Sequence, residues 1–168
     1  MNPKQLNTTE KNKALDSLIQ ILKFPSISTN PSFKADVLAC KDWLINYCKG
    51  IGFPVVECLE TAGHPSVYCE WITDPSQPTL LIYGHYDVQP PEPYELWHSP
   101  PFEPRIQDGF IYARGASDNK GMILAHLEAI RLLSTQLGQP PINIKCIIEG
   151  EEEIGSMHLE EIVKQHKS

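Results

Sequence analysis

The sequence predicts an α/β fold, in which one sheet carries helices on both faces. Segments with apolar residues at helical spacing alternate along the chain with short strand-like segments. This alternation is typical of a sheet whose strands are joined by helices. The 168 residues suffice for one domain with a real core, and no internal repeat, low-complexity tract or linker divides them.

Four segments are expected to be helices: residues 10–24, 34–49, 119–137 and 156–165. In the first, Leu15, Leu18 and Leu22 form an apolar stripe that ends before Pro25. Short strands are expected at 54–58, 66–72, 79–83, 110–112 and 142–149. The run at 79–83 is continuously apolar, which is typical of a strand covered on both faces. Residues 89–105 are rich in proline, which removes backbone donors, so this segment is expected to be a rigid loop.

Bulk properties disfavour several classes of partner. The formal charge is −7, whereas nucleic acids and acidic membranes attract basic surfaces. No apolar run reaches the roughly 18 residues of a membrane helix, and the start has no apolar core of a secretory signal. The five cysteines form no C-x-x-C pair, so we expect small buried thiols in a reduced, cytoplasmic protein.

Three short motifs carry candidate metal chemistry. His85 follows the apolar strand, and Asp87, two residues on, points the same way in extended backbone and can hold one ring nitrogen. Asp118 precedes a helix and is flanked by glycines. A run of three glutamates, 151–153, lies in a tight glycine-bounded turn after the last strand. The alternatives are a hydrogen-bonded strand end, a helix cap and a solvated acidic turn, respectively.

The three motifs share one topological position, because each follows a predicted strand. In a parallel α/β sheet, functional groups collect at the carboxyl ends of the strands. An imidazole and several carboxylates at one edge form the ligand set of a hydrolytic two-metal centre.

These motifs resemble those of the dinuclear-zinc metallopeptidases, a family that includes carnosinase-type dipeptidases, aminoacylases, glutamate carboxypeptidases and succinyl-diaminopimelate desuccinylase. The cytosolic dipeptidase branch is the most similar. The resemblance is carried by residues 83–90, Trp97 with 100–104, 111–121 and 149–156. It implies a three-layer α/β/α sandwich with a mostly parallel central sheet, of the phosphorylase/hydrolase-like type. Residues 1–168 would be the N-terminal part of the catalytic domain, without the lid and dimerisation domain or the C-terminal part.

The resemblance also implies roles at the site. His85 corresponds to a ligand of one zinc, oriented by Asp87, and Asp118 to the carboxylate that bridges both metals. Glu153 corresponds to the ligand of the other zinc and Glu152 to the general base. The implied reaction cleaves amide bonds of dipeptides or short peptides by a hydroxide that bridges two Zn²⁺ ions, for which Mn²⁺ or Co²⁺ can substitute. The full-length form would be a homodimer.

Some features depart from the family pattern. Glu151 falls outside it, and Asn119 stands where many members have a second aspartate, after a peptide bond that is cis in the family. Further ligands, an acidic residue and a distant histidine, have no counterpart in the chain. His158 and His166 are possible substitutes, with surface histidines as the alternative.

Each zinc would then keep two protein ligands, whereas catalytic zinc usually has three. We therefore expect weak or absent metal binding by this chain alone. Two further functions stay open: an inactive fragment that binds a partner through an exposed sheet edge, and an N-acyl-amino-acid deacylase.

Overall fold

The computed structural model describes residues 7–165. Its helices are α1 (Thr8–Leu22), α2 (Lys34–Gly50), α3 (Lys120–Leu137) and α4 (Leu159–Gln165). Its strands are β1 (Val55–Leu59), β2 (Ser66–Trp71), β3 (Thr79–His85), β4 (Arg105–Gln107), β5 (Phe110–Tyr112) and β6 (Asn143–Glu149). Every predicted helix and strand is present, with ends shifted by a few residues. Among these residues, no helix is both long and apolar enough to cross a membrane.

The main sheet has the strand order β1-β2-β6-β3, which confirms the α/β class. The sheet is mixed and not mostly parallel as the resemblance implied: the β3–β6 pair is parallel, while β1–β2 and β2–β6 are antiparallel. Connection length explains the mixture. A short turn joins β1 to β2, which permits antiparallel pairing, whereas α3 provides the crossover that the parallel pair requires.

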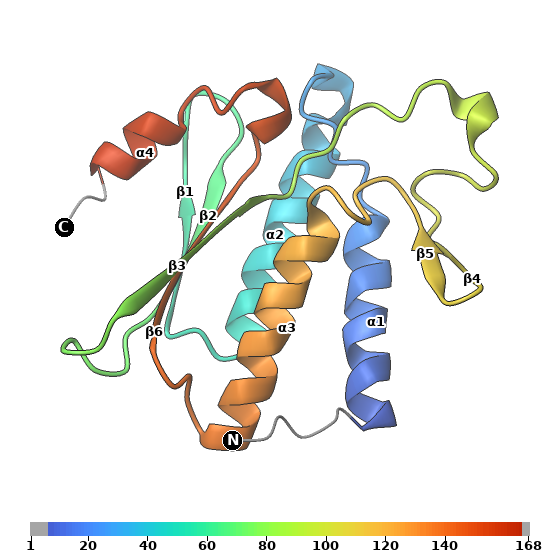
Figure 1. Cartoon of the computed structure of the whole chain (residues 1–168). Helices are drawn as coiled ribbons and strands as arrows, with labels where there is room; N and C mark the ends of the chain where they lie inside the picture. Colours follow the sequence, from blue (N-terminus) through green and yellow to red (C-terminus); the bar gives the residue numbers. More distant parts are fainter. Residues whose placement is uncertain (1–6, 166–168) are drawn as a thin grey trace.

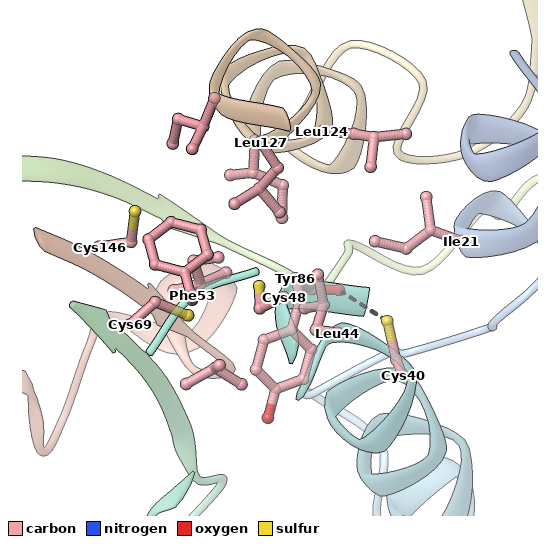
Figure 2. Close-up of a cluster of buried hydrophobic side chains, with 14 of the residues drawn as sticks. Ile21, Cys40, Leu44, Cys48, Phe53, Cys69, Tyr86, Leu124, Leu127 and Cys146 are labelled. Atoms are coloured by element: carbon pink, nitrogen blue, oxygen red, sulfur yellow. Dashed lines mark hydrogen bonds between the residues drawn. The ribbon is translucent and has the colours of Figure 1, made fainter. Parts of the chain in front are cut away.

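Helices cover one face of this sheet. α2 packs on β1 and β2, α3 packs on β3, and α1 packs on α3. In Figure 1 these three helices lie side by side, while α4 lies apart from them on the opposite side of the sheet in that view. Figure 2 shows the core between helices and sheet, where Leu44, Leu127 and Phe53 meet. Four of the five free cysteines are buried, as expected, and they are Cys40, Cys48, Cys69 and Cys146.

The expectation that residues 79–83 are covered on both faces is wrong. β3 is the edge strand of the sheet, and Leu80, Leu81 and Tyr83 are 48%, 58% and 49% exposed. α3 packs on one face of the strand, while its other face and free edge meet solvent. The apolar sheet edge anticipated from the sequence is therefore present.

Strand β4 is a second difference, because residues 105–107 pair with β5 instead of ending the proline-rich loop. The hairpin turns at Asp108 and Gly109, which have φ values of 52° and 82°. An Asp-Gly pair between two short strands is a strong hairpin signal, since that turn needs positive φ at both positions. The Asp108-Gly109 pair in the sequence therefore accounts for the hairpin.

Candidate metal centre

The candidate centre lies at the carboxyl end of the parallel pair β3–β6. His85 is the last residue of β3 and stands opposite Glu149, the last residue of β6. The acidic turn Glu152–Ile154 follows β6 directly, and Asp118 lies just before α3, which packs on β3. Residues far apart in sequence therefore converge, because strand and helix ends meet at one edge of the sheet.

Acidic side chains surround one ring nitrogen of His85. The Nε2 atom lies 3.1 Å from Oδ1 of Asp118 and 3.7 Å from Oε2 of Glu152. Ligand atoms of His85, Glu152 and Glu153 lie within 4.8 Å of one another, and within residues 7–165 this is the one group with that property. The His85 side chain is 5% exposed, whereas those of Asp118 and Glu152 are 75% and 42% exposed. A buried imidazole thus faces carboxylates that open to solvent.

Asp87 holds both His85 and the acidic turn in position. Its carboxylate is fully buried and accepts a hydrogen bond from the Ser28 hydroxyl at 2.6 Å. It also accepts the backbone N–H groups of Glu152 at 3.3 Å and Glu153 at 3.1 Å. The Nδ1 atom of His85 lies 3.3 Å from Oδ1 of Asp87 and 3.2 Å from its backbone oxygen. Asp87 therefore fixes both the imidazole and the acidic turn, and leaves Nε2 of His85 toward the carboxylates.

The electrostatics of this pocket favour a protonated His85. Burial disfavours the charged ring, but the hydrogen bond and charge of Asp87, together with the charge of Glu152, outweigh burial and raise the pKa of His85 to about 9. A cation bound at Nε2 would occupy the place of this proton. The carboxylates that raise the pKa are the groups that would attract a metal ion.

Close backbone contacts hold the start of α3 against β3. A Cβ atom on Gly84 would lie 2.2 Å from Cγ2 of Ile123, so the approach requires glycine. A Cβ atom on Gly121 would lie 1.9 Å from the backbone oxygen of Ala116. The peptide bond between Asp118 and Asn119 is cis, as the family resemblance implied.

The compact group formed by His85, Glu152 and Glu153 differs in one member from the predicted ligands, which are His85, Asp118 and Glu153. Glu152, the predicted base, belongs to the group, while Asp118 contacts His85 but lies outside it. The Glu153 carboxylate accepts a hydrogen bond from the Gln89 amide at 2.8 Å. All the predicted site residues are therefore brought to one place, with Glu152 and Glu153 facing the same space.

Several supporting residues were missed. Glu149 is 2% exposed and accepts the hydroxyls of Tyr83 at 2.5 Å and Ser156 at 2.9 Å. Burial raises the pKa of Glu149 against the lowering effect of these bonds. No local pattern in the sequence singles out Glu149 or Ser28 as a buried support of the site.

Neither proposed substitute ligand gains support. Nδ1 of His158 lies 2.8 Å from Oε2 of Glu151, and His158 is not a member of the compact group. His166 lies outside the described residues.

The donor set fits a divalent cation. Imidazole nitrogen and carboxylate oxygen are ligands that zinc accepts, and manganese and cobalt accept them too. A second carboxylate, Asp87, holds the far ring nitrogen of His85, which is the usual support of a metal-binding histidine. A cleft of about 990 Å³ is lined by Trp97, Arg114 and Ser117, among others, and Ser117 is the residue before Asp118.

Metal-dependent hydrolases commonly place an imidazole and clustered carboxylates at the carboxyl ends of parallel strands in an α/β sheet, as this chain does. Comparison with known proteins agrees with that class. The model of peptidase family M20/M25/M40 matches residues 81–167, and the chain belongs to this family.

Named relatives include several dipeptidases. Beta-Ala-His dipeptidase of Rattus norvegicus is 42% identical over 103 residues, which cover 61% of this chain and 21% of the relative. The Cys-Gly metallodipeptidase DUG1 of Candida albicans is 29% identical over 167 residues, covering 91% of this chain and 34% of the relative.

Solved structures show the same fold. Human carnosine dipeptidase 1 superposes with a TM-score of 0.86 at 31% identity, over 95% of this chain and 36% of that chain. The metallo-carboxypeptidase Sso-CP2 from Sulfolobus solfataricus gives 0.83 at 39% identity, over 91% and 34%. The chain thus spans between about a fifth and about a third of the length of these relatives.

Proposed function

We propose that this chain is the metal-binding portion of a hydrolase that cleaves amide bonds of dipeptides or short peptides. The observation that carries the proposal is the convergence of His85, Glu152 and Glu153, with Asp118 3.1 Å from His85. The names of the relatives support the substrate class, since two of them are a Beta-Ala-His dipeptidase and a Cys-Gly metallodipeptidase.

In this proposal His85, Asp118 and Glu153 hold the metal, and Asp118 serves two ions. Zn²⁺ is our first choice, with Mn²⁺ or Co²⁺ as substitutes. A bound ion would polarise the scissile carbonyl and lower the pKa of a water molecule. Asp87 keeps the imidazole in the orientation that leaves Nε2 free for metal.

Glu152 acts as the general base. Its carboxylate is half-exposed and faces the same space as His85, so a water molecule can reach it. Glu152 takes a proton from the attacking water and returns it to the leaving amine. The hydrogen bond from its backbone N–H to Asp87 supports the turn from which it acts.

The chain covers only about a third of the length of these relatives. We propose that residues 1–168 correspond to the N-terminal part of the catalytic domain, and that the remaining metal ligands come from regions that these residues do not match. The same regions would supply the contacts of a homodimer. A cytoplasmic location is proposed from the free, mostly buried cysteines.

Two alternatives have less support. Succinyl-diaminopimelate desuccinylase of Methylobacillus flagellatus is 34% identical over 73% of this chain, and this similarity supports the deacylase alternative. The Cys-Gly metallodipeptidases of Candida albicans and Schizosaccharomyces pombe cover about nine-tenths of the chain, which favours dipeptide hydrolysis. The exposed edge of β3 favours a purely partner-binding role.

Turnover of a Glu152→Gln variant tests the proposal. In the complete zinc-loaded protein, we expect hydrolysis of β-Ala-His or Cys-Gly to fall by about 10²- to 10⁴-fold, because the base is lost while the ligands remain. Glu160→Gln is the matched control, since Glu160 is an exposed residue of α4 paired with Lys164. Unchanged turnover in Glu152→Gln contradicts the assigned base.

A further inference from the structure

Glu151 differs from the two glutamates that follow it. It is 3% exposed, whereas Glu152 and Glu153 reach the surface. An ionised carboxylate is costly to bury unless hydrogen-bond donors replace the lost water. The sequence pattern of the family gives Glu151 no role, so its burial calls for a physical explanation.

Two donors from separate segments satisfy Glu151. Oε1 accepts the backbone N–H of His64 at 3.0 Å, and Oε2 accepts Nδ1–H of His158 at 2.8 Å. When the Glu151 carboxylate is ionised it can only accept, so the donor in this bond is then Nδ1–H of His158. The approach depends on Gly63, where a Cβ atom would lie 1.7 Å from Oε1 of Glu151.

The same residues connect to the candidate metal centre. Nε2 of His64 lies 3.2 Å from the backbone oxygen of Ser28, whose hydroxyl bonds to Asp87. Asp87 in turn accepts the N–H groups of Glu152 and Glu153. The acidic turn is therefore held by two buried carboxylates, Glu151 at its start and Asp87 beneath it.

The backbone of Glu151 is part of the same turn. Its carbonyl oxygen accepts the N–H groups of Ile154 at 3.2 Å and Ser156 at 2.8 Å. Any shift of Glu151 consequently moves Glu152 and Glu153, which lie between these bonds. The Glu151 side chain points inward, so its carboxylate pairs with His158 away from solvent.

We propose that Glu151 is a positioning residue: braced by His64 and His158, it fixes the turn that presents Glu152 and Glu153 to the metal. This role rests on the proposed function and adds a residue to it. Partners of this kind affect metal affinity without touching the metal.

A Gly63→Ala variant tests the contact between Glu151 and His64 without substituting any residue of the acidic turn. Gly63 is exposed and its φ lies outside the left-handed region, so alanine does not strain the backbone. The new methyl displaces the Glu151 carboxylate from the N–H of His64. We expect hydrogen exchange of the Glu152 and Glu153 amides, followed by NMR in the metal-free chain, to accelerate about tenfold or more through local opening.

Gly50→Ala is the matched control, because a Cβ atom there meets nothing within 4 Å. Its exchange rates at Glu152 and Glu153 should equal those of the unmodified chain, and amides of β2 should be unchanged in both variants. If Gly63→Ala leaves the two turn amides within twofold of the unmodified chain, Glu151 does not position the turn.

Cobalt titration of the complete protein supplies the second readout. Glu151→Ala should weaken Co²⁺ binding, followed by its visible absorption, by about tenfold. Glu151→Gln should restore most of the affinity, because its amide oxygen still accepts from His64 and its amide nitrogen can donate to a neutral His158. Equal affinities in the alanine and unmodified chains overturn the proposal, and if Glu151→Ala does not fold, Gly63→Ala decides in its place.

The two readouts separate this proposal from the proposed function. A complete protein that binds no Co²⁺ at any concentration counts against the metal centre. The exchange rates of the Glu152 and Glu153 amides then still decide whether Glu151 positions the turn.

Discussion

The hydroxyl of Ser28 donates a 2.6 Å hydrogen bond to Oδ2 of Asp87, across 59 residues of sequence. Neighbouring contacts reinforce this link, since Ile27 forms a parallel β-bridge with Val88 and Ser26 bonds to the backbone oxygen of Tyr86 at 2.7 Å. The segment after α1 thus runs alongside the end of β3. A region that reads as a plain loop is part of the support of the candidate centre.

Loss of the Ser28 hydroxyl should destabilise the fold. In Ser28→Ala the buried Asp87 carboxylate loses one donor, and hydrogen bonds to charged groups contribute about 1.5–3 kcal/mol. We expect the free energy of unfolding in urea to fall by about that amount.

An exposed pair of the same type serves as the control. The Ser76 hydroxyl donates to Asp74 at 2.8 Å on the surface, so Ser76→Ala should leave the free energy of unfolding nearly unchanged. Equal effects of the two substitutions would show that burial of Asp87 does not strengthen its bond to Ser28.

The pKa of His85 makes the stability of the metal-free chain depend on pH. The folded state holds the His85 proton up to about pH 9, whereas the unfolded state releases it near pH 6.5. The contribution of His85 is therefore complete below about pH 6.5 and is lost as the pH rises toward 9. Urea midpoints measured across this window should fall with increasing pH.

A His85→Gln variant isolates this contribution. It lacks the titrating ring, so its urea midpoint should decline less between pH 6.5 and 9 than that of the unmodified chain. Identical slopes for both proteins would contradict a raised pKa of His85.

Gly84 should tolerate no side chain. The methyl of Gly84→Ala would overlap Ile123 at the contact between β3 and α3, and such overpacking costs about 1–3 kcal/mol. Thermal or urea unfolding measures the loss. Gly50→Ala, at the open end of α2, should instead be neutral or slightly stabilising, and a neutral Gly84→Ala would mean that α3 can move away from β3.

Much of the fold could be predicted because helices and strands carry periodic apolar patterns. The stripe of Leu15, Leu18 and Leu22 led to the correct helix, α1. Exposure could not be predicted in the same way. The apolar run of β3 reads alike for a central and an edge strand, because local sequence does not record which neighbours cover it.

The candidate centre was predicted in part for a similar reason. His85, Asp118 and the acidic turn each follow a strand, so the topology brings them together. Glu151 reads as one of three solvated glutamates, and its burial depends on His64 and His158, which lie in other segments. Contacts between distant loops leave no local pattern in the sequence.

Anomalous diffraction from crystals of the complete protein soaked in saturating Zn²⁺ would test the central claim most directly. The proposal predicts a zinc peak about 2.0–2.2 Å from Nε2 of His85 and from a carboxylate oxygen of Asp118 or Glu153. Crystals of His85→Ala should lack that peak, and those of His98→Ala, which loses an exposed histidine, should keep it. A peak elsewhere, or none between His85 and these carboxylates, would contradict the metal centre.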